Sequence, residues 1–311
     1  MGFDHRSRNG LAWLLIAFLF SGFGISCAYR PANQMTIRDF DGDSSYRKKV
    51  GVMTLANTTI FTSNQVAHPF MASFLSSMTD KMGDAILVLP GTVDAPPFLA
   101  DPPRMAAGEI DGFTLSGLAR QAGINIVVSP MLMDIRVRSK NTGFWFFRDV
   151  EHSLQIQTAT ALYDAITGSR LDLKILTDEV DIDDSEAEAI RSGQEIQVAD
   201  LVEAAEEMGE KLGRRMGDAI EDSKWQGSVI VVADGGCVLP SGRDVGIEQG
   251  DRLAVLGVIG VISGLGEQRY VVPGTQIGDL TITQVDDQKS IGVPESGEPP
   301  PVGSIVIPLA Q

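Results

Sequence analysis

The chain of 311 residues is 43% hydrophobic and 21% charged, and its formal net charge is −16. These values are typical of a globular protein and exclude an intrinsically disordered one. The acidic balance argues against nucleic-acid binding, which needs a basic surface, and favours a soluble, acidic exterior.

The first 27 residues have the pattern of an export signal. Two arginines precede an apolar run, Leu11–Phe20, that is too short to span a bilayer, and small residues follow it. The segment ends in Gly24–Cys27 (GISC), which is similar to the end of a bacterial lipoprotein signal. We therefore expect lipid on Cys27 and sorting to the periplasmic side of the outer membrane. The alternative is an ordinary signal peptide cut after Ala28.

Cysteines and histidines are too few for common catalytic or metal-binding arrangements. Cys27 and Cys237 are the two cysteines, so lipid on the first leaves the second without a disulfide partner. His68 and His152 lie far apart, outside any zinc spacing or Ser-His-Asp pattern. We therefore expect a protein that is not an enzyme, with no catalytic residues, no metal and no cofactor.

Residues 28–47 read as a polar linker, and residues 48–226 as an α/β domain. The expected elements are strands at 48–57 and 85–89, a helix between them, a short helix capped by Thr114, and a strand from Ile124 with a break at Pro130. Pro69 is expected in the first turn of the first helix, and Gly83 at its end.

Strict alternation of apolar and polar residues predicts an antiparallel hairpin over residues 154–182. Residues 198–222 then have the apolar stripe of a helix. Three glycines four residues apart accompany that stripe, and we expect them to allow close approach to a sheet; they are Gly209, Gly213 and Gly217.

The sequence pattern changes at Gly227, and short Val- and Ile-rich strands alternate with Gly/Pro turns from there to residue 311. This pattern predicts a small all-β barrel. The glycine-rich segments 257–260 and 264–266 have strand signals on both sides, so we expect hairpin turns and not a nucleotide loop. Asp251 is expected to accept backbone N–H bonds in a turn.

The segment Phe144–Phe147 (Phe144, Trp145, Phe146 and Phe147) is the most aromatic stretch outside the signal. It lies between two predicted strands, and polar residues flank it. Two interpretations remain open at this stage: core packing of a strand, or an exposed apolar tip that contacts a partner or a membrane.

The C-terminal pattern at residues 232–255, which includes the motif Val245–Asp251 (VGIEQGD), resembles the SH3-like domain of the flagellar T-ring assembly protein family (FlgT-like). Residues 49–55 and 118–128 resemble the middle domain of the same family, which is similar to the TolB N-terminal domain and the curli secretion lipoproteins (CsgG-like). The family's separate N-terminal domain has no counterpart here.

The resemblance implies an α/β, mixed-sheet TolB-N/CsgG-like domain followed by an SH3-like barrel. It also implies a non-enzymatic assembly or scaffold lipoprotein in a homo-oligomeric ring around a flagellar basal body, with envelope proteins as partners. The alternative is a CsgG-like component of secretion or envelope transport.

Overall fold

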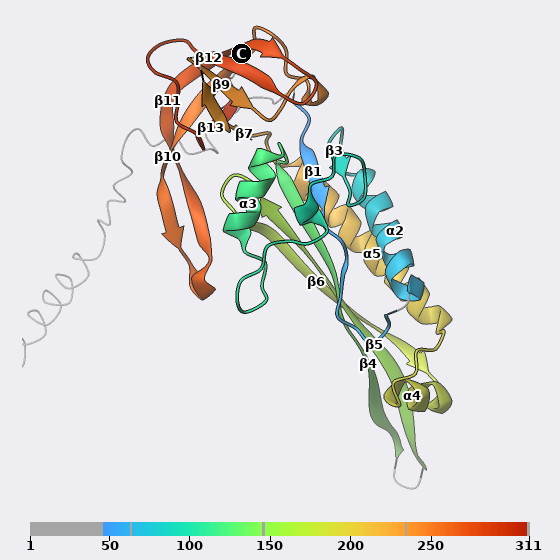
Figure 1. Cartoon of the computed structure of the whole chain (residues 1–311). Coiled ribbons are helices and arrows are strands. Elements are labelled where there is room, and N and C mark those ends of the chain that lie inside the picture. The colour runs from blue at the N-terminus through green and yellow to red at the C-terminus, as the bar shows by residue number, and fades with distance from the viewer. Residues whose placement is uncertain (1–45, 63, 145–146, 234, 310–311) are drawn as a thin grey trace, which may run out of the picture. The chain divides into compact units, whose positions relative to one another are not determined.

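The structure is a computed structural model that describes residues 46–62, 64–144, 147–233 and 235–309 (Figure 1). The first group of elements comprises β1 (Lys49–Val52), β2 (Ala56–Asn57), α2 (Asn64–Thr79), β3 (Ile86–Val88), η2 (Pro97–Leu99), α3 (Gly112–Gln121), β4 (Ile126–Phe144), β5 (Phe147–Asp164), β6 (Arg170–Ile182), α4 (Asp184–Arg191) and α5 (Ala199–Glu221).

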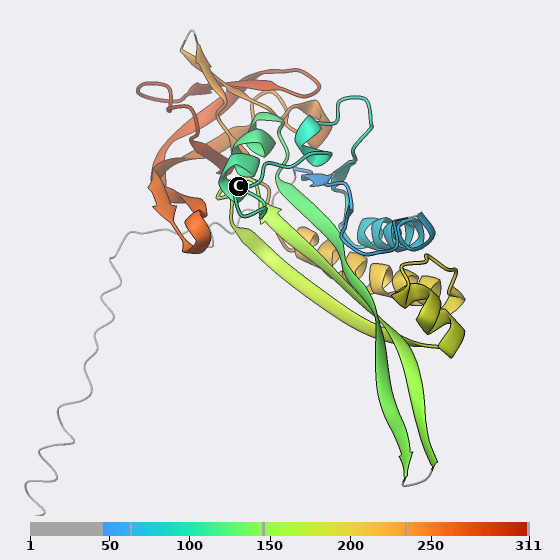
Figure 2. The ribbon, with the colours of Figure 1, turned by 60° about the horizontal axis from the view of Figure 1, so that its bottom comes forward.

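Over the described residues, these elements form a six-stranded mixed sheet in the order β3-β1-β4-β5-β6, with β2 beside β4. β1 is parallel to β3 and β4, whereas β4, β5 and β6 pair antiparallel. Helices α2 and α5 lie side by side, and their apolar residues share one core with the strands of the sheet (Figures 1 and 2). The predicted mixed α/β sheet is therefore confirmed.

The second group of elements comprises β7 (Gly227–Ser228), β8 (Val231–Ala233), β9 (Gly236–Leu239), η3 (Arg243–Val245), β10 (Arg252–Ser263), η4 (Leu265–Glu267), β11 (Arg269–Val285), β12 (Ser290–Pro294) and β13 (Ile305–Pro308). In the described part of the chain they form an antiparallel sheet in the order β7-β13-β10-β11-β12-β9-β8. The sheet curls over a core of its own (Figure 1).

The predicted hairpin of alternating residues is confirmed as β5 and β6. Leu154 and Ile156 are buried in the core beneath the helices, whereas the intervening Gln155 and Gln157 are only half-buried on the opposite face. The sequence predicted this hairpin because one face of the two strands is packed in the core and the other is not, which alternates apolar and polar residues along each strand.

The predictions of local structure at Pro130, Thr114 and Pro69 were wrong. β4 passes through Pro130, which pairs with Thr160 without a break. Asp111, not Thr114, caps α3 by accepting the Thr114 N–H at 3.0 Å. Pro69 lies in the interior of α2, because that helix begins five residues earlier.

One of the two glycine-rich segments of the second sheet forms the predicted turn, and the other does not. Residues 264–266 lie between β10 and β11, so the predicted turn is confirmed there. Residues 257–260 lie inside β10, where the register with β11 shifts, and the predicted turn is wrong. The glycines here accompany β-bulges within one long strand.

The three glycines of α5 allow close approach to a helix, which corrects the prediction of a sheet. A Cβ at Gly209, Gly213 or Gly217 would lie 2.4, 2.3 or 2.5 Å from an atom of the segment from α2 to Lys81. The two helices therefore pack backbone against backbone along this line. Close packing offsets the low helix propensity of glycine.

We predict that Gly213→Ala destabilises the protein, although alanine favours helix by about 1 kcal/mol. The added methyl group would meet the Phe74 carbonyl oxygen at 2.3 Å, and such overpacking costs about 1–3 kcal/mol or more. Gly117→Ala in α3 is the control, because its Cβ meets no atom closer than 3.9 Å. Urea unfolding should show a loss for the first variant and a small gain for the second; a gain for both would contradict the close packing.

The core of the second sheet includes two residues from outside 227–311. Trp225 is 1% exposed and packs edge-on against Tyr46, with ring centroids 5.1 Å apart. The Tyr46 hydroxyl donates to Asp251 Oδ2 at 2.6 Å, and the same oxygen accepts the Glu248 N–H at 2.8 Å. The predicted turn role of Asp251 is therefore confirmed, while its bond to Tyr46 was not foreseen.

We predict a loss of stability above about pH 10 that depends on Tyr46, because ordinary tyrosines ionise there. Burial, followed by the hydrogen bond and negative charge of Asp251, raises the pKa of Tyr46. The raised pKa contributes stability that is fully present below the pKa of the unfolded chain and is lost as the pH rises beyond it.

Urea unfolding at neutral and alkaline pH tests this prediction. Tyr46→Phe should lose about 1 kcal/mol at neutral pH and show a shallower decline above about pH 10 than the wild type. Asp251→Asn keeps an oxygen acceptor and should change the neutral-pH stability modestly. Equal alkaline slopes for the wild type and Tyr46→Phe would count against the assignment.

Candidate interaction surface

The structure describes part of one predicted site, the segment Phe144–Phe147, and none of the other, Cys27. Cys27 lies outside the described residues. Trp145 and Phe146 also lie outside them, but the flanking Phe144 and Phe147 pair with each other at the end of β4 and β5. The side chains of this aromatic segment are not part of the description, so the choice between core packing and an exposed tip remains a prediction.

Strands β4 and β5 run beyond the end of their neighbour β6, as far as Phe144 and Phe147. β6 ends at Ile182, opposite His152 of β5. From the pair Ser139–His152 to the pair Phe144–Phe147, β4 and β5 continue as a two-stranded ribbon (Figure 2). Residues 139–141 at its start are exposed.

The base of this ribbon is tied to α4, a helix that was not predicted. His152 Nδ1 lies 2.8 Å from Ser139 Oγ and 3.2 Å from an Arg191 nitrogen. Asp183 caps α4 in a capping box with Glu186. The spacing of that aspartate and glutamate is the sequence signal that could have located the helix.

The face of the sheet opposite α2 and α5 carries apolar residues in rows. The register places Met131, Ala159 and Ile175 side by side across β4, β5 and β6. The next row contains Ala161 and Leu173. Leu173 and Ile175 are exposed, although the solvated face of an antiparallel sheet normally carries polar side chains.

A hollow of about 1000 Å³ lies over this face. Its walls come from the sheet, from the loop around residues 100–110, and from the turn between β10 and β11. Eight of the 24 residues that line it have polar or charged side chains, and these include Arg104, Glu109, Tyr163 and Arg170. Burial raises the pKa of the Tyr163 phenol, and nearby Arg170 opposes the shift. The other lining residues are apolar or glycine, so the hollow offers apolar contact beside charged side chains.

The described residues offer no donor set for a metal, because they contain no group of three or more His, Cys, Asp or Glu side chains in suitable proximity. Within the same residues, no helix has the length and apolar character needed to cross a membrane.

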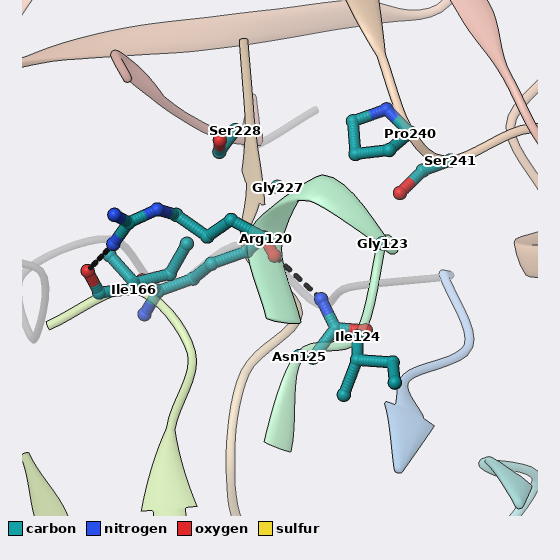
Figure 3. A pocket seen from close by; sticks show the side chains of 10 residues that line it. Arg120, Gly123, Ile124, Asn125, Ile166, Gly227, Ser228, Pro240 and Ser241 are labelled. Carbon is teal, nitrogen blue, oxygen red and sulfur yellow. Dashed lines mark hydrogen bonds between the residues drawn. The ribbon is translucent and has the colours of Figure 1, made fainter. Parts of the chain in front are cut away.

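A small cavity lies where the two sheets meet (Figure 3). Arg120 Nη1 donates to the Ile166 carbonyl at 2.6 Å, and Asn125 donates to the Gln226 carbonyl at 2.6 Å. The cavity volume of about 10 Å³ has room for no more than about one water molecule. This place is a structural joint and not a ligand site.

We predict that Gly123→Ala disrupts this joint. Gly123 ends α3 with φ +68°, and a Cβ there would lie 1.9 Å from the Pro240 carbonyl oxygen. The strain and the clash together should cost at least about 3 kcal/mol in urea unfolding. Gly193→Ala is the control, since its φ is +82° but no atom lies within 4 Å. Similar losses for both variants would show that the contact with Pro240 contributes nothing.

Comparison with known proteins finds remote structural likeness only. No protein-family model matches the chain, and no curated protein matches it. The chain matches the solved structure of the lipoprotein GNA1162 from Neisseria meningitidis at TM-score 0.27 and 9% identity, covering 47% of this chain and 93% of that chain.

Two further solved structures match at similar levels. The PelC dodecamer from Paraburkholderia phytofirmans has a TM-score of 0.30 and 15% identity, covering 55% of this chain and 88% of that chain. The hypothetical protein CT253 from Chlamydia trachomatis has a TM-score of 0.30 and 14% identity, covering 56% and 96%. Likeness at this level identifies neither a family nor a function.

Proposed function

We propose that the chain is a non-enzymatic assembly lipoprotein of the cell envelope, in a ring around a flagellar basal body at the outer membrane. The observation that carries the proposal is the exposure of Leu173 and Ile175 on the face of the six-stranded sheet opposite α2 and α5. Neighbouring aliphatic side chains that are exposed in this way are typical of a protein contact site.

The local structure of the resembling segments supports the family part of the proposal. Residues 49–55 include the parallel strand β1, and residues 118–128 include the end of α3, the turn at Gly123 and the start of β4. This strand-and-helix order supports the expected TolB-N/CsgG-like domain. The curled antiparallel sheet after Gly227 likewise supports an SH3-like barrel as the second domain.

The two remaining sequence features give the protein an anchor and a contact. Lipid on Cys27 would hold the protein at the periplasmic face of the outer membrane. The aromatic segment Phe144–Phe147, at the end of the β4–β5 ribbon, would contact a partner or the membrane surface. Both roles need only apolar contact and no chemistry.

The second candidate is a CsgG-like secretion or envelope transport component. The projecting β4–β5 ribbon is the observation that favours it, because its aromatic end could contact a membrane or a channel partner. The two candidates differ in the machinery that the protein joins, and not in the surface that it uses.

A deletion strain complemented with variants tests the proposal. The wild-type gene should restore motility, and its product should co-purify with isolated basal bodies. Cys27→Ala should shift the protein from the membrane to the soluble periplasmic fraction and reduce motility. Unchanged motility after deletion, together with a loss of secreted protein or polysaccharide, would replace the flagellar role with the secretion role.

A double variant, Trp145→Ser with Phe146→Ser, separates contact from core packing. If the segment is an exposed contact site, the purified variant should keep its melting temperature but lose co-purification with basal bodies. Loss of a packed aromatic side chain would instead cost about 3–5 kcal/mol and lower the melting temperature strongly. Lys140→Ser, on the exposed ribbon, is the control.

A further inference from the structure

The long strands β10 and β11 extend as an arm beyond the rest of their sheet. β13 pairs with β10 only over residues 253–256, and β12 pairs with β11 only over residues 280–285. Residues 257–277 therefore form a two-stranded arm (Figure 1). We call this segment the β10–β11 arm.

The β11 side of the arm is fixed to the first group of elements. The Val271 N–H donates to the Thr167 carbonyl at 2.9 Å, and Gln268 Nε2 donates to the Ile110 carbonyl at 3.0 Å. The Arg269 guanidinium lies 4.2 Å from the centre of the Phe113 ring. These contacts hold the arm in place and leave its β10 side facing outward.

The outward edge of β10 has none of the usual protection of a sheet edge. No described strand pairs with residues 257–263 on that side. The sequence there, Gly-Val-Ile-Gly-Val-Ile-Ser, has no charge and no proline. Natural edge strands are normally short, charged or covered, because a free apolar edge pairs with other chains.

Other edges of the described sheets follow that rule. β3, β7 and β8 have three residues or fewer. β6 is long, but it carries several charged side chains, including Asp172 and Lys174. Among the sheet edges of the described chain, the β10 edge is long, uncharged and unpaired. We therefore expect another chain to cover it in the assembled protein.

The side chains exposed on the arm are aliphatic on both of its faces. The exposed fractions include 72% for Ile259, 57% for Ile262 and 96% for Leu265. The neighbouring Val258, Val261 and Ile277 are exposed as well. Because successive side chains of a strand alternate, Ile259 and Val261 lie on one face of the arm and Val258 and Ile262 on the other.

The sequence of the edge is also complementary to itself. Antiparallel pairing centred on Gly260 places Val258 opposite Ile262 of a second copy, and Ile259 opposite Val261 of that copy. Every valine then meets an isoleucine, which are favourable cross-strand neighbours. A Cβ at Gly260 would meet no atom within 4 Å, so the backbone is open at the centre.

We propose that two copies of this chain associate through antiparallel pairing of β10 residues 257–263, with Gly260 on the two-fold axis. The contact is isologous, because each copy contributes the same segment. The net charge of −16 makes copies repel one another, and this uncharged edge lets their backbones approach. The inference goes beyond the proposed function and does not depend on which envelope machinery the protein joins.

A charge-exchange experiment on the full chain, purified in detergent, tests the pairing and its register. Sedimentation of the wild type should show a dimer. Ile259→Glu should weaken dimerisation at least about tenfold, because an unpaired carboxylate would be buried. Mixing Ile259→Glu with Val261→Lys should restore a heterodimer, since the register places these positions opposite each other. Val302→Glu, at an exposed aliphatic residue outside the arm, should leave the dimer unchanged.

Cross-linking distinguishes this arrangement from a head-to-tail one. Gly260→Cys should give covalent dimers with a short bis-maleimide, whereas Val302→Cys should not. Circular dichroism should show that the variants remain folded. The inference is overturned if the wild type is monomeric, if Val302→Glu dissociates the dimer equally, or if the charge pair fails to restore it. It is also overturned if Gly260→Cys cross-links to an Ile175→Cys copy and not to itself, which would place the arm in the hollow of the next copy.

Discussion

The arrangement of the described chain depends on the hydrogen bonds that the buried Lys48 ammonium group donates. It donates to the carbonyl oxygens of Ile220, Glu221 and Ser223 at 2.7, 2.9 and 2.6 Å. These carbonyls lie at the end of α5, where the helix leaves acceptors unpaired and carries partial negative charge. Burial lowers the pKa of Lys48, and the three acceptors compensate for the lost hydration.

The residues next to Lys48 extend this junction to the second sheet. The Lys49 ammonium lies 2.5 Å from Asp244, and the Lys49 N–H donates to Asn125 at 2.7 Å. Tyr46 packs in the core beneath the second sheet. Tyr46, Lys48 and Lys49 therefore join β1, α5, the start of β4 and the antiparallel sheet. With this junction fixed, the surfaces available for partners are the uncovered sheet face and the two β-ribbons.

The sequence revealed the elements whose pattern depends on local packing. The alternation in β5 and β6 and the apolar stripe of α5 each reflect one buried face, and both are found where expected. The partner of α5 could not be read from its glycines, because a small residue shows only that a neighbour is close. The β10–β11 arm was read as separate short strands, since glycines usually mark turns, and only the long-range pairing shows the continuous strands.

Acidic side chains in the described structure are used in ways that bear on function. Asp111 caps α3, where hydrogen bonds from Thr114 lower its pKa although burial opposes the shift. Asp183 caps α4, and Asp164 accepts the Thr167 N–H at 2.9 Å within a turn. Together with Asp251, these carboxylates hold backbone groups and do not converge on a cleft. General acid-base chemistry needs carboxylates aimed at one substrate position. Leu173 and Ile175 on the sheet face, and Ile259 and Ile262 on the arm, are exposed, and apolar contact at such side chains is the source of binding energy that the proposed assembly role uses.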